Sequence, residues 1–381
     1  EETMMDAFLY DRFGGPEVQR VGKIPKPGPP GKGDILIKVH AASLNPVDFK
    51  QRGGGLRLIL RYGWPQLFGF DFSGEIVALG EGAGENDCGG FAVGDEVFGM
   101  VNGLRKCTCA EYCVVSADIC AKKPKNVTHV EAASVGLVGM TVVQSFGQCF
   151  RASTETPGPS PTGPRVLILR GSGGIGTIAI QLAKQMFGAR YVAVTASASK
   201  TEELQKLGAD RVIDYKTQKF EKELASSDEQ ELFDVILDGT GEASKCVPLI
   251  RKGGGIASIE ASPDGEALQR WLSCNATSPE GYGHARAGVA SFISNPVGSW
   301  LIDTLTGASS LKRRCKARGA VFNHVIASGN RSHMHNIGVL MQIGRVKAQV
   351  QAVFPLARAT EAMTLLEAGR ATGKIVIEMP K

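Results

Sequence analysis

The sequence predicts an α/β protein with a β-rich first part and a second part built as a doubly wound parallel sheet. In residues 166–259, short apolar runs alternate with segments long enough for helices, which is typical of parallel strands covered by helices on both faces. Before residue 130, in contrast, short apolar runs are separated by Gly and Pro. The 48 glycines suit the tight strand-to-helix turns of such a fold.

Length and composition indicate two domains and exclude several classes of protein. A chain of 381 residues exceeds what one hydrophobic core usually organises. No window approaches 18 consecutive apolar residues, so we expect no membrane span. The net charge is only +5 and the basic residues are scattered, so we expect no nucleic-acid partner. Nine cysteines without the spacing of a disulfide framework favour a reducing compartment, and the first residues resemble neither a secretory signal nor a transit peptide.

Each expected element follows from a local pattern. In the first part, strands are expected at 34–39 and 74–80, a turn followed by a short strand at 93–99, and an Ala-rich helix at 130–150. A proline-rich linker is expected at 151–165. After it, strands are expected at 166–169, 191–195, 211–214, 233–238 and 255–259, with helices at 175–187 and 201–207. Residues 266–335 show no clear pattern, and the tail predicts a strand at 346–353, a helix at 357–367 and a strand at 374–379.

The clearest functional signal is a glycine-rich turn directly after the strand expected at 166–169. Gly171, Gly173 and Gly176 fit G-x-G-x-x-G and open an expected helix. The tight turn, the close approach of a pyrophosphate and the packing of helix on strand each exclude a side chain. The helix N-terminus offers free N–H groups and the positive end of its dipole to phosphates. The motif therefore predicts a dinucleotide site, and a tight turn without ligand is the alternative.

The end of the second parallel strand predicts which dinucleotide binds. An NAD site usually has Asp or Glu there to accept hydrogen bonds from the ribose hydroxyls, but residues 196–200 (ASASK) contain no carboxylate. A carboxylate would repel a 2′-phosphate, whereas the Ser197 hydroxyl and the Lys200 ammonium would bind it. We therefore predict NADPH as the cofactor. For Lys200 alone, a solvated position on the next helix is an alternative.

Seven segments, in order, resemble landmarks of the medium-chain dehydrogenase/reductase superfamily, in its zinc-free quinone oxidoreductase branch. They are residues 41–48 (AASLNPVD), 69–74 (GFDFSG), 93–99 (VGDEVFG), 139–141 (GMT), 207–215 (LGADRVIDY), 354–356 (FPL) and 373–374 (GK). The resemblance extends over nearly the whole chain. It implies a GroES-like catalytic domain of residues 1–143 and 344–381, and an inserted Rossmann domain of residues 144–343 that binds NADPH, with the active site in the cleft. Residues 266–335 match least.

The resemblance also implies the roles of individual residues. Asn45 and Thr141 are expected to face the nicotinamide, and Lys374 to lie near the cleft. The expected cofactor contacts are Ser172, Gly174 and Ile175 at the pyrophosphate, Ser197, Lys200 and Tyr215 at the 2′-phosphate, and Asp238, Thr240 and Gly241 beside the nicotinamide ribose. Arg170 departs from the family, which has a small residue or Gly there, and this predicts an altered phosphate turn.

The residues at the metal-ligand positions of the zinc-dependent relatives predict that this chain binds no metal. Where those relatives have Cys and a His-Glu pair, this chain has Asn45, Phe70 and Asp71. Phe cannot ligate zinc and Asn is a poor ligand for it. Four cysteines are a second candidate group (Cys88, Cys107, Cys109 and Cys113). Their spacing is wrong for a structural zinc lobe, and we interpret them as free thiols. We interpret the two remaining candidates, His333 and His335, as surface residues.

Without zinc, the acceptor must be easily reduced or be polarised by hydrogen-bond donors. A quinone or an α,β-unsaturated carbonyl accepts hydride readily, because the charge spreads through conjugation onto oxygen. We therefore hypothesise hydride transfer from NADPH to such an acceptor, with Asn45 orienting it and solvent or Tyr62 delivering the proton. Tyr62 as a packed loop aromatic is an equal alternative. An alcohol dehydrogenase is excluded by the missing metal ligands.

A second hypothesis is a non-catalytic, NADPH-binding accessory subunit of a larger organellar complex. Arg170, the divergent residues 266–335 and the basic run at 312–318 favour it. The basic run could bind a protein partner or an anionic lipid, or it could simply be the solvated face of a helix or loop. We accordingly expect either a homodimer or a subunit of a larger assembly. The expected location is the mitochondrion, with plastid and cytoplasm as alternatives.

Overall fold

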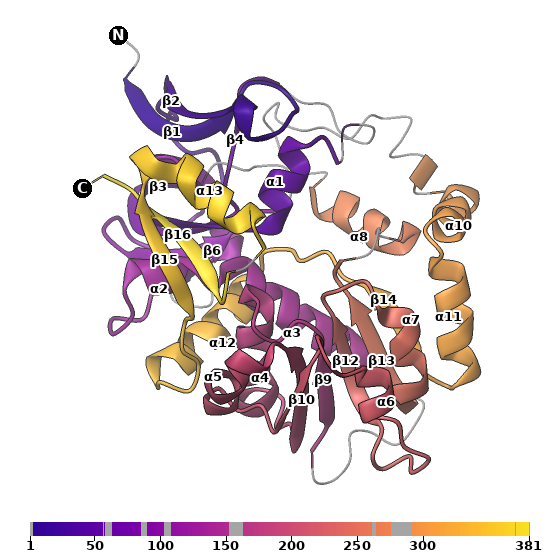
Figure 1. Ribbon diagram of the computed structural model, residues 1–381. Coiled ribbons are helices and arrows are strands. Elements are labelled where there is room, and N and C mark those ends of the chain that lie inside the picture. Colours follow the sequence, from indigo (N-terminus) through magenta and orange to yellow (C-terminus); the bar gives the residue numbers. More distant parts are fainter. Residues whose placement is uncertain are drawn as a thin grey trace. The chain divides into compact units, whose positions relative to one another are not determined.

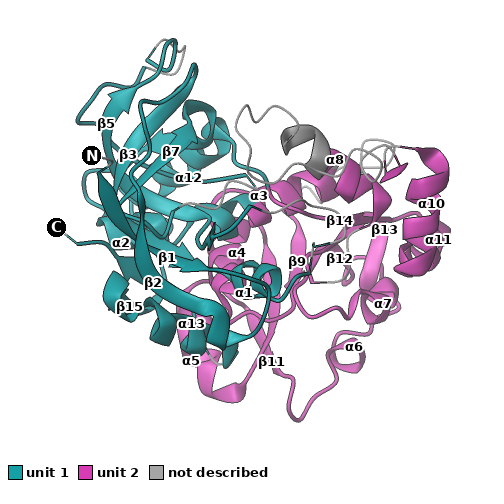
Figure 2. Ribbon diagram, turned by 90° about the horizontal axis from the view of Figure 1, so that it is seen from above, with its two compact units in different colours: residues 1–140, 274–286, 328–381 teal, residues 141–273, 287–327 magenta. Residues whose placement is uncertain are grey.

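The structure is a computed structural model (Figure 1). It describes residues 3–55, 57, 63–84, 90–102, 108–151, 163–260, 264–275, 292–293, 295–369 and 371–380. The chain divides into two compact units, shown in teal and magenta in Figure 2. Unit 1 comprises residues 1–140, 274–286 and 328–381, and unit 2 comprises residues 141–273 and 287–327. Residues 328–343, which the sequence assigned to the second domain, thus group with unit 1.

Unit 1 is built mainly from antiparallel strands. Its strands are β1 (Met4–Tyr10), β2 (Gln19–Pro25), β3 (Asp34–Leu44), β4 (Gln66–Leu67), β5 (Asp71–Leu79), β6 (Glu96–Met100), β7 (Tyr112–Ser116), β8 (Cys120–Lys122), β15 (Val350–Pro355) and β16 (Lys374–Glu378). Its helices are α1 (Pro46–Arg52), α2 (His129–Ala133), α12 (Arg331–Gln342) and α13 (Ala359–Glu367). The larger sheet has the order β15-β16-β3-β5-β6-β8, with β7 also paired to β3, and a smaller sheet has the order β2-β1-β4.

The long strand β3 organises this unit because it pairs with three other strands. It runs antiparallel to β5, β7 and β16, so the C-terminal strand β16 lies beside a strand from the start of the chain (Figure 1). A core of buried aromatic side chains, including Phe8, Tyr10, Phe68 and Phe72, packs with aliphatic residues of β3, α13 and β16. The ends of β3, β5 and β16 are thereby fixed next to one another.

Unit 2 is the doubly wound parallel sheet that the alternating pattern predicted. Its strands are β9 (Arg165–Ile168), β10 (Tyr191–Ala196), β11 (Arg211–Asp214), β12 (Phe233–Asp238), β13 (Ile250–Ser258) and β14 (Val321–His324). Its helices are α4 (Gly174–Gln185), α5 (Thr201–Lys206), α6 (Phe220–Glu223), α7 (Ala243–Cys246), α8 (Gly265–Asn275), α10 (Pro296–Leu305) and α11 (Ala308–Ala317). The order β11-β10-β9-β12-β13-β14, with every pair parallel, confirms the predicted class.

The order of the strands places a topological switch point at β9. The chain proceeds from β9 to β10 on one side and later to β12 on the other, and ligands of such sheets bind at the carboxyl ends of the strands where the order reverses. The helix α3 (Gly136–Arg151) precedes β9, and the boundary between the units falls within it, after Met140.

Two parts of the chain differ from the sequence prediction. Residues 266–335, which showed no clear pattern, contain helices α8, α10 and α11 and the edge strand β14. The strand expected at 346–353 is β15, at Val350–Pro355, and α12 ends shortly before it at Gln342. Among the residues described, we find no helix long and apolar enough to cross a bilayer.

Candidate functional site

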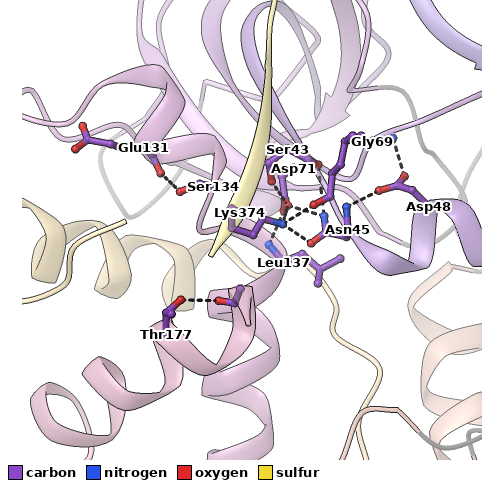
Figure 3. Close-up of polar contacts among 12 residues, drawn as sticks. Ser43, Asn45, Asp48, Gly69, Asp71, Glu131, Ser134, Leu137, Thr177 and Lys374 are labelled. Atoms are coloured by element: carbon purple, nitrogen blue, oxygen red, sulfur yellow. Dashed lines mark hydrogen bonds and ion pairs between the residues drawn. The ribbon is translucent and has the colours of Figure 1, made fainter. Parts of the chain in front are cut away.

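The first polar site lies in unit 1, where three strand ends meet. Ser43 at the end of β3 pairs across the sheet with Asp71 of β5, and Leu44 pairs with Ile375 of β16. The first residue of β16, Lys374, therefore lies beside the end of β3 and beside Asp71 (Figure 3). Asn45 follows β3 and caps α1. Its backbone N–H donates to Asp48 Oδ2 at 2.9 Å, which is why the segment Asn45-Pro46-Val47-Asp48 ends a strand and starts a helix.

A buried ion pair forms the centre of this site. The Asp71 and Lys374 side chains are 0% and 5% exposed, and Lys374 Nζ lies 3.3 Å from Asp71 Oδ2. Asp71 Oδ2 also accepts hydrogen bonds from Ser43 Oγ at 2.7 Å and from Asn45 Nδ2 at 2.8 Å. Asp71 Oδ1 accepts the backbone N–H of Leu137, in the first turn of α3. The carboxylate is therefore surrounded by donors, which is the condition for burying a charge.

The ammonium of Lys374 is held by three oxygens. Besides Asp71 it donates to the carbonyl of Leu44 at 2.9 Å and to the amide oxygen of Asn45. Burial lowers the pKa of Lys374 because the charged form loses hydration, and the charge of Asp71 opposes this effect. The Asn45 amide is thus engaged on both sides, by Lys374 at its oxygen and by Asp71 at its nitrogen. The sequence had singled out Asn45 and Lys374 but not Asp71 as their partner.

The second site is the glycine-rich turn of unit 2, between β9 and α4. A Cβ on Gly171 would lie 2.7 Å from Cβ of Val194, and a Cβ on Gly176 would lie 2.4 Å from the carbonyl oxygen of Arg170. Packing within the chain thus requires both glycines. Gly173 is different, because the nearest described atom to an added Cβ is 3.5 Å away. The chain's own packing therefore does not require a glycine at position 173, the N-cap of α4, where an added methyl group would make ordinary contact with Arg170.

The remaining members of the motif complete the turn. Gly174 and Ile175 are the first residues of α4, and Ser172 precedes its N-cap. Thr177 Oγ1 donates to the Gly174 carbonyl at 3.2 Å (Figure 3). The N–H groups in the first turn of an α-helix have no acceptor within the helix, so those at the start of α4 are available to a phosphate.

The predicted 2′-phosphate residues lie at the ends of β10 and β11. The backbone N–H of Tyr215 donates to the carbonyl of Ala196 at 3.3 Å, which brings Tyr215 beside Ser197. The Tyr215 side chain is 62% exposed, and Ser197 is half-buried. Lys200 Nζ lies 3.2 Å from Glu203 Oε2, a carboxylate neighbour that the sequence prediction did not include.

The end of β12 is a tight turn organised by a buried aspartate. Asp238 Oδ1 accepts the backbone N–H groups of Thr240, Gly241 and Glu242 at 2.9–3.1 Å. Asp238 Oδ2 accepts from the backbone of Ala243 and from Ser258 Oγ. Both carboxylate oxygens are therefore turned toward the protein, and the turn they hold presents Thr240 and Gly241 at the surface.

The two other predicted catalytic residues are placed differently. Thr141 is buried in α3, at 4% exposure. Tyr62 lies outside the described residues. Asn45 and Lys374 meet within unit 1, whereas Thr141 and all the other predicted cofactor residues belong to unit 2.

Comparison with known proteins identifies the family. A model described as "Alcohol dehydrogenase GroES-like domain" matches residues 31–125, and one described as "Zinc-binding dehydrogenase" matches residues 207–377. The mitochondrial NAD(P)H oxidoreductase RTN4IP1 of Homo sapiens is 30% identical over 393 residues, which cover 99% of this chain and 90% of the relative. The chain belongs to the medium-chain dehydrogenase/reductase superfamily. The family predicted from seven ordered segments, and its GroES-like and Rossmann folds, are thereby confirmed.

Two further relatives place the chain among reductases of this superfamily. The 2-methylene-furan-3-one reductase of Solanum lycopersicum is 30% identical over 329 residues, covering 84% of this chain and 79% of the relative. The solved structure of the quinone oxidoreductase from Coxiella burnetii has a TM-score of 0.74 and 28% identity, covering 99% of this chain and 100% of that one.

The residues at the superfamily's zinc-ligand positions do not fit a metal. Phe70 is packed in the apolar core at 3% exposure. Asn45 and Asp71 direct their oxygens to the ammonium of Lys374, so a lysine cation neutralises the carboxylate that a metal would otherwise neutralise. Within the described ranges, no group of three or more His, Cys, Asp and Glu residues could hold a metal ion.

Of the cysteines considered as metal ligands, Cys109 and Cys113 are buried and form no disulfide, and Cys88 and Cys107 lie outside the described residues. Cys120 and Cys149 are also buried and free. Burial raises the pKa of both, that of Cys149 to about 12, so these two thiols stay protonated at neutral pH and are poor nucleophiles.

Proposed function

We propose that this protein is an NADPH-dependent reductase that transfers hydride to a quinone or an α,β-unsaturated carbonyl without zinc. The observation that carries the proposal is the buried ion pair that Lys374 forms with Asp71, which stands at one of the zinc-ligand positions. A buried lysine fixed by three oxygens cannot polarise a substrate carbonyl as an open-site metal does. Acceptors whose conjugation already stabilises the added charge need no such polarisation, and the named activities of the tomato and Coxiella burnetii relatives support this class.

The residues of unit 2 are proposed to bind the cofactor along the carboxyl ends of β10, β9 and β12. The backbone of Gly171–Gly176 would hold the diphosphate at the start of α4. Ser197, Lys200 and Tyr215 would contact the 2′-phosphate, and Thr240 and Gly241 the nicotinamide ribose. We propose Asp238 as the residue that positions this last turn. When bound, NADPH supplies the hydride.

The residues of unit 1 are proposed to fix the geometry of the catalytic domain. Lys374 and Asp71 hold Asn45 in one orientation, and Asp71 also anchors Leu137 at the start of α3. Asn45 and Thr141 are proposed to face the nicotinamide and the acceptor. The proton that completes the reduction is proposed to come from solvent or from Tyr62.

Purified protein tests this activity directly. NADPH oxidation is followed at 340 nm with a panel of benzoquinones, naphthoquinones and enones, and with simple ketones as the negative class. We expect turnover with conjugated acceptors and none with ketones. Tight NADPH binding without turnover of any conjugated acceptor would refute the catalytic proposal.

The preference for NADPH over NADH is a separate proposal with its own test. Ser197→Asp adds a carboxylate where ribose hydroxyls bind in NAD enzymes, and two unit charges 4 Å apart repel by roughly 1–4 kcal/mol near a protein surface. We expect the variant to lose affinity for NADPH and to keep or gain affinity for NADH. Ser227→Asp, at an exposed position of unit 2 between α6 and β12, is the matched control. A wild-type preference for NADH would overturn the assignment.

A second candidate is a non-catalytic, NADPH-binding accessory subunit of an organellar complex. Exposed apolar side chains on α10 favour it, with Trp300 at 61% and Leu305 at 85% exposure. The mitochondrial human relative supports a mitochondrial location, with plastid and cytoplasm as alternatives. Size-exclusion chromatography of native extract separates the two: a free homodimer supports the enzyme, and co-migration with a large complex supports the subunit.

A further inference from the structure

Arg170 has an unusual backbone conformation at the entrance to the glycine-rich turn. Its φ of 67° makes it the one non-glycine residue with positive φ in the described part of the chain. A side chain in this region clashes with its own backbone, so the conformation persists only where the surroundings enforce it. Here the Arg170 N–H donates to Thr195 Oγ1 at 3.0 Å, and its carbonyl accepts the N–H of Gly173 at 3.1 Å.

The side chain of Arg170 lies over the turn that receives the phosphates. A Cβ added to Gly173 would lie 3.6 Å from Cγ and 3.7 Å from Nε of Arg170. A Cβ added to Gly239, just beyond β12, would lie 3.9 Å from Cβ of Arg170. The side chain thus lies beside the N-cap of α4 and toward β12. The 2′-phosphate residues, in contrast, follow β10 on the other side of β9.

The guanidinium has no ion-pair partner or hydrogen-bond acceptor among the described residues, although most exposed arginines of unit 2 do. Arg211, for example, pairs with Glu223, and Arg318 with Glu229. An arginine carries five donors in a planar fork suited to phosphate oxygens. Its location beside free N–H groups at a helix N-terminus adds a full charge to a site already suited to anions.

We propose that Arg170 binds the diphosphate of the cofactor directly and thereby increases affinity for NADPH and NADH alike. This inference rests on the proposed function, because it assumes that the glycine-rich turn binds a dinucleotide. The strained backbone is the structural consequence of placing a cation where glycine would fit without strain. Arg170 is a binding residue for the diphosphate and makes no contribution to the choice between the two cofactors.

Three substitutions at this position separate charge from backbone strain. Arg170→Gly removes both, Arg170→Asn removes the charge and retains a residue that tolerates positive φ, and Arg170→Lys keeps the charge without the planar fork. Lys219→Gln removes an exposed positive charge elsewhere in unit 2 and controls for net charge. Dissociation constants for NADPH and NADH are measured by fluorescence titration, and melting temperatures are measured without cofactor.

We expect Arg170→Gly and Arg170→Asn to weaken both cofactors by about ten-fold at low ionic strength, as for a charge-assisted hydrogen bond. Arg170→Lys should recover part of this loss, and Lys219→Gln should change nothing. The NADPH-to-NADH affinity ratio should stay constant, and the loss should shrink in high salt. Arg170→Gly should melt at the same temperature as the wild type or higher, because strain is relieved.

Equal or tighter NADPH binding by Arg170→Gly would overturn the inference, and tighter binding would show that the side chain obstructs the turn. A loss confined to NADPH would also overturn it, by assigning Arg170 to the 2′-phosphate. If the wild-type protein binds neither cofactor, the proposed function itself fails. If the wild-type protein and Arg170→Gly bind NADPH equally well, only the role of Arg170 is refuted and the proposed function remains.

Discussion

Replacing Lys374 with Met should destabilise the protein strongly, because the substitution leaves the Asp71 carboxylate buried without its counter-ion. Asp71 is 0% exposed, and the carbonyl of Leu44 and the amide oxygen of Asn45 also lose their donor. Removing one partner of a buried ion pair typically costs about 3–5 kcal/mol. We expect the lower half of this range, because Asp71 keeps hydrogen bonds from Ser43, Asn45 and Leu137.

A double-mutant cycle in urea unfolding, followed by circular dichroism, measures the interaction. Asp71→Asn alone should also destabilise, because it leaves the ammonium of Lys374 without a counter-ion. The Asp71→Asn, Lys374→Met double variant should cost less than the sum of the singles, with a coupling of about 1–3 kcal/mol. Lys125→Met, at an exposed position of unit 1, is the control. A Lys374→Met effect as small as that of the control, or strict additivity in the cycle, would refute the reasoning.

Three further predictions follow from other parts of the structure. Burial lowers the pKa of His129 below 6.5, against the opposing effect of Glu96. The unfolded state therefore binds more protons, and the stability of the protein should fall as the pH decreases through and below 6.5. Melting temperatures at pH 7.5 and 5.5 should show this fall, and the difference between the two should be smaller in His129→Gln. Gly176→Ala should lower the melting temperature and abolish NADPH binding, since its Cβ would lie 2.4 Å from a backbone oxygen; an unchanged melting curve contradicts this. Enzymatic turnover should be the same with EDTA or with added zinc, and a chelator-sensitive rate would disprove a metal-free site.

The sequence predicted those features that depend on neighbouring residues. Strand, glycine turn and helix follow one another between β9 and α4, so the phosphate turn is visible as a local pattern. The packing around Gly171 and Gly176 explains why glycine is required there. The end of β3 is equally local, because Asn45, Pro46 and Asp48 form a helix start within four residues.

The sequence could not show the contacts that depend on strand register. Asp71 and Lys374 are separated by 303 positions and meet only because β5 and β16 both pair with β3. The family resemblance placed Asp238 beside the ribose, but it gave no sign that the Asp238 oxygens accept hydrogen bonds from the following backbone N–H groups. The short polar turn after it, with Gly at 239 and 241, is the signal for such a role.

The helices within residues 266–335 were missed although a start signal is present. Asn295 caps α10 by accepting the N–H of Val297, and Pro296 occupies the first helical position. Gly307, in a left-handed conformation at φ 75°, separates α10 from α11. These signals span only a few residues each, and most apolar residues of α10 are exposed, so the helix lacks the regular apolar stripe by which a packed helix is recognised in a sequence.

The affinity of Gly173→Ala for NADPH tests the central claim most directly. An added Cβ finds no described atom closer than 3.5 Å, so the ligand-free protein should fold and melt as the wild type does. A diphosphate bound against the turn would meet this methyl group, and we expect NADPH affinity to fall by about ten-fold or more, the effect of lost close backbone contacts. Undiminished NADPH binding by Gly173→Ala would contradict the account.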